Sequence, residues 1–208
     1  IEIHKPKLIF IAYPNNPTGN AFDRGAIETI ITSTDAMVVL DEAYYAYADD
    51  SFLMDIAKYP NLVLLRTVSK IGFAGLRLGL LIGVQDTVSE LDKLRLPYNI
   101  NTLTQVSANF LLQEKDEIDK NAKAILAERA SLSTALSGID GLSVYPSQAN
   151  FILFRAPGAN ELFETLKSKG VLIKNLSSAQ GLTDCLRVTV GSKEENNSFI
   201  NIVKNYYG

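Results

Sequence analysis

The stretch RTVSKIGFAGLRLG, residues 66–79, decides how the rest of the chain is interpreted. It follows an apolar, strand-like run at residues 61–65 and leads into another apolar run. A lysine just past the end of a strand, in a turn that contains glycine, can be partly desolvated, and burial disfavours its charged form. The amine of Lys70 is therefore a candidate nucleophile.

The same turn offers a place for an anion. Arg77 lies seven residues after Lys70, and Ser69 directly precedes it. A guanidinium presents a bidentate fork to a phosphate, and hydroxyl groups add further donors. Pyridoxal 5'-phosphate needs such a pair, because it is bound covalently by a lysine at one end and held by its anion at the other. The alternative is a lysine and an arginine on a solvated turn, and this stretch alone does not decide between the two.

The composition excludes several classes of function. Hydrophobic residues make up 47% of the 208 residues and charged residues 21%, as in ordinary soluble proteins with one large or two modest domains. The net charge of −3 gives no basic stripe, so neither nucleic acid nor a membrane surface is an expected partner. A single cysteine, Cys185, excludes an internal disulfide and fits a cytoplasmic location. The single histidine, His4, has no neighbour at metal-ligand spacing, so we expect no metal site and no histidine-based triad.

Short apolar runs and the residues that follow them indicate the fold. Asp23 is placed to cap a helix over residues 24–33, and a second helix is expected from a cap at Asp86 or Thr87 to about residue 95. Strands that alternate with helices predict an α/β fold with a largely parallel sheet, and the first run reads as a strand buried on both faces. Polar residues at the carboxyl ends of these strands then meet at one edge, where such sheets bind ligands. The expected strands are residues 7–12, 36–40, 61–66 and 78–84.

The second half of the chain has a different pattern. A long helical pattern over residues 101–137 suggests a connection between two domains, and the shorter elements after it predict a small α+β domain. We therefore expect a large domain over residues 1–100, a connecting helical region over 101–137 and a small domain over 138–208. In the small domain the expected strands are 142–144, 150–154, 171–173 and 185–190, and the expected helices are about 160–169 and 194–206.

Asp41 ends a nearly uninterrupted apolar strand, where an unpaired carboxylate would be costly. A cation should therefore contact it. A protonated pyridine nitrogen is one such cation, and keeping that proton makes the ring a stronger electron sink. A helix cap or an ordinary salt bridge is the structural alternative for Asp41.

Four motifs together resemble the fold type I aminotransferases, which depend on pyridoxal 5'-phosphate. They are YPNNPTG at 13–19, DEAY at 41–44, SK at 69–70 with AGLR at 74–77, and LRVTVG at 186–191. The resemblance covers essentially the whole chain and is greatest to the histidinol-phosphate branch of the family. It implies a homodimer that transfers an amino group between L-histidinol phosphate and 2-oxoglutarate, giving imidazole-acetol phosphate and L-glutamate in histidine biosynthesis.

The resemblance also implies roles for residues at the cofactor. Lys70 matches the lysine that forms a Schiff base with the cofactor and later moves the substrate proton, and Asp41 matches the partner of the pyridine nitrogen. Asn16 and Tyr44 match the pair that bonds the ring oxygen. Three residues fall at the phosphate end, namely Thr67, Ser69 and Arg77, although the hydroxyl of Thr67 could equally stabilise the turn.

Three further residues match positions at the substrate. Arg187 matches an arginine that binds the substrate carboxylate in most relatives and faces the substrate phosphate in the histidinol-phosphate branch. Lys174 lies thirteen residues earlier, where that branch often has arginine, and it keeps the charge but not the bidentate fork. Asn150 lies where the small domain approaches the active site, and it could instead be a turn residue that begins a strand.

The resemblance implies a further portion ahead of Ile1, which in the family completes the large domain and stacks on the cofactor ring. We therefore expect these residues to be the C-terminal part of the enzyme, and without that portion to hold cofactor weakly and not to turn over. Edges and faces of an incomplete parallel sheet would be left exposed.

Several alternatives stay open. The same chemistry could act on another substrate, as in an aromatic or aspartate aminotransferase or a related cofactor-dependent decarboxylase. A second alternative is a non-catalytic, aminotransferase-like sensing domain of a transcription regulator. A third is a nucleotide-binding α/β domain, but the spacing of Gly72, Gly75 and Gly79 does not match the dinucleotide fingerprint.

Overall fold

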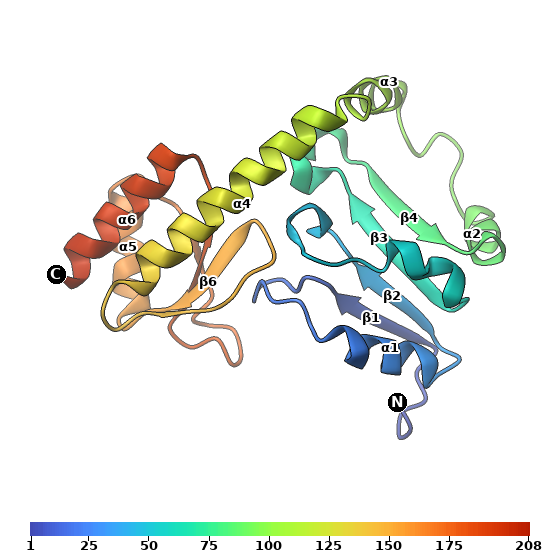
Figure 1. Ribbon diagram of the computed structural model, residues 1–208, viewed down its shortest axis with the longest axis horizontal. Coiled ribbons are helices and arrows are strands. Elements are labelled where there is room, and N and C mark those ends of the chain that lie inside the picture. The colour runs from blue at the N-terminus through green and yellow to red at the C-terminus, as the bar shows by residue number, and fades with distance from the viewer. The chain divides into compact units, whose positions relative to one another are not determined.

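The first half of the chain forms a four-stranded sheet in the computed structural model, which describes residues 1–208 (Figure 1). β1, β2 and β3 are parallel, and β4 runs antiparallel to β3. The α/β fold with a largely parallel sheet is therefore confirmed, and the loops that follow the three parallel strands leave the same edge of the sheet. In order across the sheet, the strands are β1 (Leu8–Ala12), β2 (Met37–Asp41), β3 (Leu62–Thr67) and β4 (Gly79–Gly83).

Helix α1 (Arg24–Thr32) crosses one face of this sheet, between β1 and β2 (Figure 1). It begins as predicted, because the side chain of Asp23 accepts a hydrogen bond from the amide of Ala26. Two short 3₁₀ helices, η1 (Tyr45–Tyr47) and η2 (Leu53–Lys58), connect β2 to β3. One buried core joins these elements, and it contains Tyr13, Ile27, Ile31, Val38, Leu40, Phe52, Leu62 and Leu64.

The opposite face of the sheet is covered only in part. Gly83 of β4 lies against Val63 and Val88, which places α2 (Gln85–Asp92) over this face near β3 and β4. On β1, Leu8 is 48% exposed and Phe10 is 65% exposed. The prediction that the first strand is buried on both faces is therefore wrong, because α1 and its core cover one face of β1 alone.

Two helix predictions need correction. α2 begins after Val84, which makes no side-chain cap, and Asp86 lies inside the first turn, where its charge favours the helix dipole. The pattern over residues 101–137 is not one helix. It forms α3 (Thr102–Leu111), capped by the side chain of Asn101, and α4 (Lys115–Ser137), with a break at residues 112–114.

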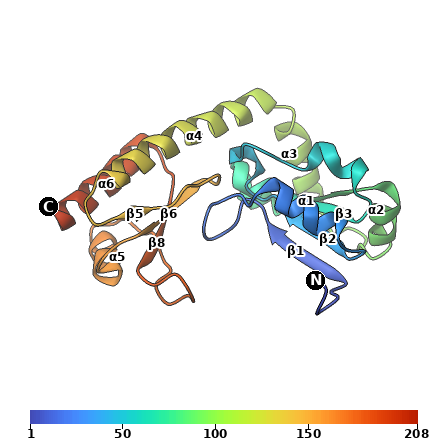
Figure 2. The same ribbon diagram turned by 60° about the horizontal axis from the view of Figure 1, so that its bottom comes forward.

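The second half of the chain contains an antiparallel sheet. α4 runs alongside the C-terminal helix α6 (Lys193–Tyr207), which starts with a capping box formed by Ser192 and Glu195 (Figure 2). Residues from α4, α5 (Ala159–Ser168), α6 and one face of the sheet form a single core, which includes Leu132, Leu136, Ile152, Phe154, Leu162, Leu166, Leu186, Val188, Phe199 and Val203. The strand order is β5 (Ser143–Val144), β6 (Phe151–Arg155), β8 (Cys185–Thr189) and β7 (Lys174–Asn175).

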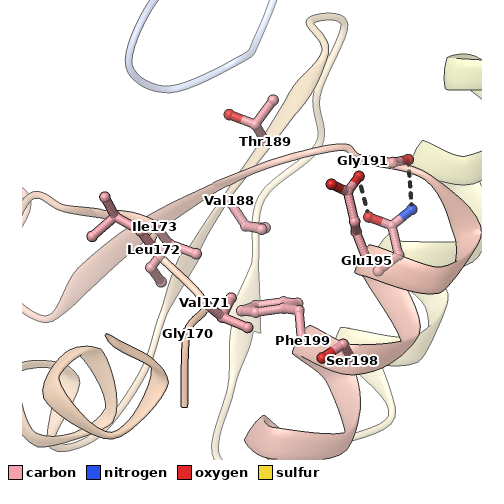
Figure 3. A pocket seen from close by; sticks show the side chains of 11 residues that line it. Gly170, Val171, Leu172, Ile173, Val188, Thr189, Gly191, Glu195, Ser198 and Phe199 are labelled. Carbon is pink, nitrogen blue, oxygen red and sulfur yellow. Dashed lines mark hydrogen bonds between the residues drawn. The ribbon is translucent and has the colours of Figure 1, made fainter. Parts of the chain in front are cut away.

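The predicted strand at residues 171–173 is wrong. Val171 and Ile173 pack against the core and Leu172 is 76% exposed, so the side chains alternate as in a strand. Backbone pairing with β8 begins only at Lys174. Figure 3 shows this segment beside a hollow of about 430 Å³ that β8 and the start of α6 also line. The alternation therefore reports which side chains are buried, and not which backbone groups are paired.

The chain divides into two units that do not follow the sequence order strictly. The first unit comprises residues 1–15 and 21–120, and the second comprises residues 16–20 and 121–208. The loop that carries Asn16 therefore belongs with the C-terminal half. The interpretation of these units as the large and small domains of an enzyme stays a prediction. None of the helices has the length and apolar character needed to cross a membrane.

The core of the second unit gives a direct test of the packing. Leu166 is fully buried and Leu172 is exposed. We expect Leu166→Ala to lower the free energy of unfolding by about 2–5 kcal/mol, because it removes buried methyl groups and leaves a cavity. The matched variant Leu172→Ala should change it by less than about 0.5 kcal/mol. Urea unfolding followed by circular dichroism measures both, and equal losses would contradict the described core.

Candidate functional site

The turn that carries Lys70 is shaped by short-range hydrogen bonds. β3 ends at Thr67, and residues Ser69–Ile71 form a 3₁₀ turn that Gly72 closes with a φ of 107°, a conformation that glycine adopts readily. The hydroxyl of Thr67 donates to the carbonyl of Leu78 at 3.2 Å and accepts the amide of Ser69 at 3.1 Å. Thr67 thus has the turn-stabilising role that the sequence left open, and its contact with a phosphate stays a prediction.

Lys70 extends from this turn with an exposed side chain. The prediction that burial activates its amine is therefore wrong for this chain. Its Nζ lies 5.6 Å from the ring centroid of Tyr44, which is only 6% exposed. Its backbone carbonyl accepts a hydrogen bond of 2.6 Å from the hydroxyl of Tyr47. Two tyrosines of one segment therefore contact Lys70, one at its side chain and one at its backbone.

Arg77 follows the short 3₁₀ helix at Ala74–Leu76, just after the lysine turn. Its backbone is left-handed, with a φ of 50°, and its exposed guanidinium lies 3.4 Å from the carbonyl of Ala74. Ser69, eight residues before Arg77, is half-buried. These positions leave the guanidinium of Arg77 accessible to an anion.

Asp41 and Glu42 follow β2 and face different surroundings. Asp41 is exposed, and its Oδ1 accepts the amide of Ala43 at 3.0 Å. Asp41 is therefore not buried as its position after an apolar strand suggested, and its contact with a cation stays a prediction; the buried carboxylate is its neighbour. Glu42 is 1% exposed, and its Oε1 accepts the amide of Phe52 at 2.8 Å.

The buried carboxylate of Glu42 is neutralised by Arg66. The guanidinium donates to Oε2 of Glu42 through Nε at 3.0 Å and through Nη2 at 2.8 Å. Nη2 also donates to the hydroxyl of Ser51, and the guanidinium lies 4.2 Å from the ring centroid of Tyr45. Because Arg66 belongs to β3 and Glu42 follows β2, the pair joins the ends of two neighbouring strands.

A second ionic cluster ties the end of β1 to the same segment. Nη1 of Arg24 donates to both oxygens of Asp50, at 2.8 and 2.6 Å, and Nη2 donates to Asp55. The hydroxyl of Tyr13, just after β1, donates to Asp50 at 3.1 Å. Burial and the bond to Asp50 raise the pKa of Tyr13 to about 12. Burial alone would raise the pKa of Asp50, but hydrogen bonds from Arg24, the Ser51 amide and Tyr13 lower it.

In the second unit, Arg187 and Lys174 form a pair of cations. They are directly opposed residues on the antiparallel strands β8 and β7, so their side chains leave the same face of the sheet. The guanidinium of Arg187 lies 4.8 Å from the ring centroid of Phe151, and its Nη1 donates to Oδ1 of Asn16. Its Nε is buried and has no hydrogen-bond partner. Lys174 is exposed.

The loop that carries Asn16 packs closely against the rest of the second unit. The carbonyl of Gly19 accepts the amide of Gln148 at 2.7 Å. A Cβ at Gly19 would lie 2.7 Å from the hydroxyl of Ser147, and its φ of 81° also favours glycine. Asn150 is half-buried, and its carbonyl accepts the amide of Val190 at 2.9 Å. This bond agrees with the alternative that Asn150 is a turn residue at the start of a strand. Contact of Asn150 with a substrate stays a prediction.

The structure thus groups the predicted residues within each unit. In the first, Lys70 lies beside Tyr44; in the second, Arg187 is opposite Lys174 and bonds Asn16. The sequence did not assign roles to Glu42, Arg66 and Tyr47. The rule that a carboxylate after an apolar strand needs a cation applies to Glu42 as well as to Asp41, and it would indicate a partner such as Arg66 for Glu42. No group of histidine, cysteine, aspartate and glutamate side chains is placed to hold a metal ion.

Comparison with known proteins gives a consistent match. The family model for aminotransferase class I and II matches residues 2–203. A histidinol-phosphate aminotransferase from Vesicomyosocius okutanii is 71% identical over 207 residues, which is 100% of this chain and 58% of that protein. Histidinol-phosphate aminotransferase 2 from Nitrosococcus oceani is 51% identical over 202 residues, which is 96% of this chain and 56% of that protein. The chain therefore spans somewhat more than half the length of these relatives.

Solved structures have the same fold. The histidinol-phosphate aminotransferase from Clostridium acetobutylicum has a TM-score of 0.89 at 23% identity, covering 97% of this chain and 64% of that one. The L-threonine-O-3-phosphate decarboxylase from Porphyromonas gingivalis has a TM-score of 0.84 at 27% identity, covering 96% and 64%.

The cluster around Asp50 predicts an acid dependence of stability. The pKa of Asp50 lies below its ordinary value of 3.8 in the folded state, so its stabilising effect is complete above that value and is lost as the pH falls through the lowered pKa. We expect Asp50→Asn to flatten the fall in the free energy of unfolding between about pH 5 and about pH 2. The change should stay below about 1 kcal/mol, because the side chain is 40% exposed. Urea titrations across this range test it, with the exposed Asp35→Asn as control; an unchanged slope in Asp50→Asn would contradict the described cluster.

Proposed function

The chain belongs to the aminotransferase class I and II family, and we propose that it is part of a histidinol-phosphate aminotransferase that depends on pyridoxal 5'-phosphate. The proposed reaction transfers the amino group of L-histidinol phosphate to 2-oxoglutarate, giving imidazole-acetol phosphate and L-glutamate. We further propose a cytoplasmic homodimer. The names of the relatives that cover the whole chain at 71% and 51% identity support this assignment.

The chemistry of the side chains in the first unit fits the cofactor. Asp41 offers an exposed carboxylate for the protonated ring nitrogen, and Tyr44 offers a phenol beside the amine of Lys70. Ser69 and the exposed Arg77 offer a hydroxyl and a guanidinium for the phosphate. When bound, pyridoxal 5'-phosphate supplies an electron sink for the bond that breaks at Cα of the substrate. A role of Asn16 at the ring oxygen stays a prediction.

The residues of the first unit would then have different roles in catalysis. Lys70 would bind the cofactor covalently. Once released by substrate, its amine would accept the proton from Cα of the substrate and return a proton to the cofactor carbon bonded to the transferred nitrogen. The negative charge of Asp41 would keep the ring nitrogen protonated. Tyr44, buried against the lysine amine, would limit the directions in which the amine can point.

The observation that carries the substrate assignment is the opposition of Lys174 and Arg187 on neighbouring strands. Two cations on one face of a sheet suit a phosphate dianion better than a single carboxylate, because each can neutralise one charge. The buried Nε of Arg187 lacks a partner and would gain one from a phosphate oxygen. The imidazole ring of the substrate needs no histidine from the protein, so the single His4 is compatible with this assignment.

One alternative has specific support. The L-threonine-O-3-phosphate decarboxylase that shares the fold is named for a phosphorylated substrate, so two cations alone do not separate amino transfer from loss of carbon dioxide. Histidinol phosphate carries no carboxylate to lose. Formation of imidazole-acetol phosphate with conversion of 2-oxoglutarate into glutamate therefore supports the proposal, and release of carbon dioxide from a phosphorylated amino acid favours the alternative.

The substrate assignment predicts a phosphate-specific defect. In the full-length protein, we expect Lys174→Gln to lower kcat/KM for L-histidinol phosphate by about tenfold, because one charge-assisted contact to the phosphate is lost. The rate with L-histidinol, which lacks the phosphate, should change by less than about twofold. The charge-conserving Lys174→Arg is the matched control and should retain the phosphate preference. Equal losses with both substrates would contradict a phosphate contact at Lys174.

A further inference from the structure

Tyr47 makes a buried contact to the backbone of Lys70. The side chain of Tyr47 is 2% exposed, and its hydroxyl donates to the Lys70 carbonyl at 2.6 Å across 23 residues of sequence. Burial raises the pKa of this phenol, which keeps it protonated and able to donate. The contact therefore ties the last residue of η1, which follows β2, to the turn that follows β3.

The segment that carries Tyr47 is itself fixed by other bonds. The amide of Glu42 donates to the carbonyl of Leu65 at 2.8 Å, and the side chain of Glu42 pairs with Arg66. The carbonyl of Tyr44 accepts the amide of Tyr47 at 2.9 Å within η1. Other groups than the hydroxyl of Tyr47 make these bonds, so the segment should stay in place when that hydroxyl is removed and the carbonyl of Lys70 loses its bond.

The remaining freedom of Lys70 lies in its backbone and its long side chain. Its side chain is exposed. Gly72, two residues after Lys70, has a left-handed backbone, and Gly75 follows three residues after Gly72. Glycine allows backbone conformations that other residues avoid. The bonds that shape the turn involve Thr67, Val68 and Leu78. The Tyr47 hydroxyl supplies a constraint at the peptide group from which the reactive amine extends.

We infer that Tyr47 is a positioning residue for Lys70, which holds the lysine backbone so that the ε-amine points toward the cofactor aldehyde. This inference rests on the proposed function of Lys70. Tyr44, three residues earlier, contacts the amine end of the same side chain, so one segment positions both ends of the lysine. The effect of Tyr47 that we infer is on the orientation of the lysine, through its backbone carbonyl.

The test compares two variants that remove the same kind of bond. Tyr47→Phe deletes the hydroxyl but keeps the buried ring. Tyr207→Phe deletes an equal bond of 2.6 Å, from Tyr207 to the carbonyl of Pro157 in the second unit. Each full-length variant is incubated with pyridoxal 5'-phosphate for a series of times and reduced with borohydride. Mass spectrometry then measures the rate at which the reduced adduct appears on the peptide that contains Lys70.

We expect Tyr47→Phe to slow labelling of Lys70 by about tenfold or more, since small errors in orientation are costly to reacting groups. Tyr207→Phe should label within about twofold of the unchanged protein, although it also loses a hydrogen bond to a backbone carbonyl. Labelling is carried out well below both unfolding midpoints. Amide hydrogen exchange at residues 69–73 should also be faster in Tyr47→Phe alone, with or without cofactor.

The outcomes separate this inference from the proposed function. Normal labelling of Lys70 in Tyr47→Phe overturns the inference and leaves the proposed function intact. An equal slowing in Tyr207→Phe also overturns it, because the effect is then one of general stability. If the unchanged protein is labelled at another lysine while exchange at residues 69–73 still depends on Tyr47, the proposed role of Lys70 fails and the inference fails with it.

Discussion

The buried ion pair between Glu42 and Arg66 joins the ends of two parallel strands, and the proposed cofactor residues of the first unit depend on it. Glu42 lies between Asp41 and Tyr44 in the sequence, and Arg66 lies four residues before Lys70. A buried carboxylate is costly unless it is paired and hydrogen-bonded, and Glu42 has both the guanidinium and the Phe52 amide. The pair therefore adds a side-chain contact to the backbone pairing of β2 and β3, between Asp41 and the lysine turn.

A different constraint operates in the second unit. Like charges directly opposite each other on neighbouring strands are destabilising, yet Lys174 and Arg187 occupy such positions. Arg187 is partly stabilised by the ring of Phe151 and by Asn16, and its Nε is still left without a partner. An anion bound to both cations would relieve the repulsion and satisfy the buried donor. The arrangement is therefore consistent with the proposed phosphate site.

Much of the fold could be predicted from the sequence, because its signals were local. The apolar runs specify β1 to β4, and the side chain of Asp23 marks the start of α1 at close to its actual position. The break after α3 is not evident in the sequence, because Leu111 and Ile118 are seven residues apart, as on one face of a continuous helix. The segment at Val171–Ile173 was misread because burial on alternate sides looks the same with or without a paired neighbour.

The candidate site was harder to predict than the fold. The pattern after β2 indicates a carboxylate that needs a cation, and the structure shows such a pair at Glu42, whereas a cation at the exposed Asp41 stays a prediction. Sequence alone does not show which of two adjacent side chains turns inward. The bond from Tyr47 to Lys70 joins a side chain to a backbone carbonyl, which leaves no trace in residue type. The opposition of Lys174 and Arg187 depends on strand register, which a spacing of thirteen residues does not specify.

A double-mutant cycle on Glu42 and Arg66 tests this account most directly. Free energies of unfolding would be measured for Glu42→Gln, Arg66→Met and the double variant, with the exposed pair Glu90 and Lys93 treated in the same way. We predict a coupling of about 2 kcal/mol or more for the buried pair, and a coupling close to zero for the exposed one. A coupling near zero for Glu42 and Arg66 would contradict the claim that this pair holds the two strand ends together.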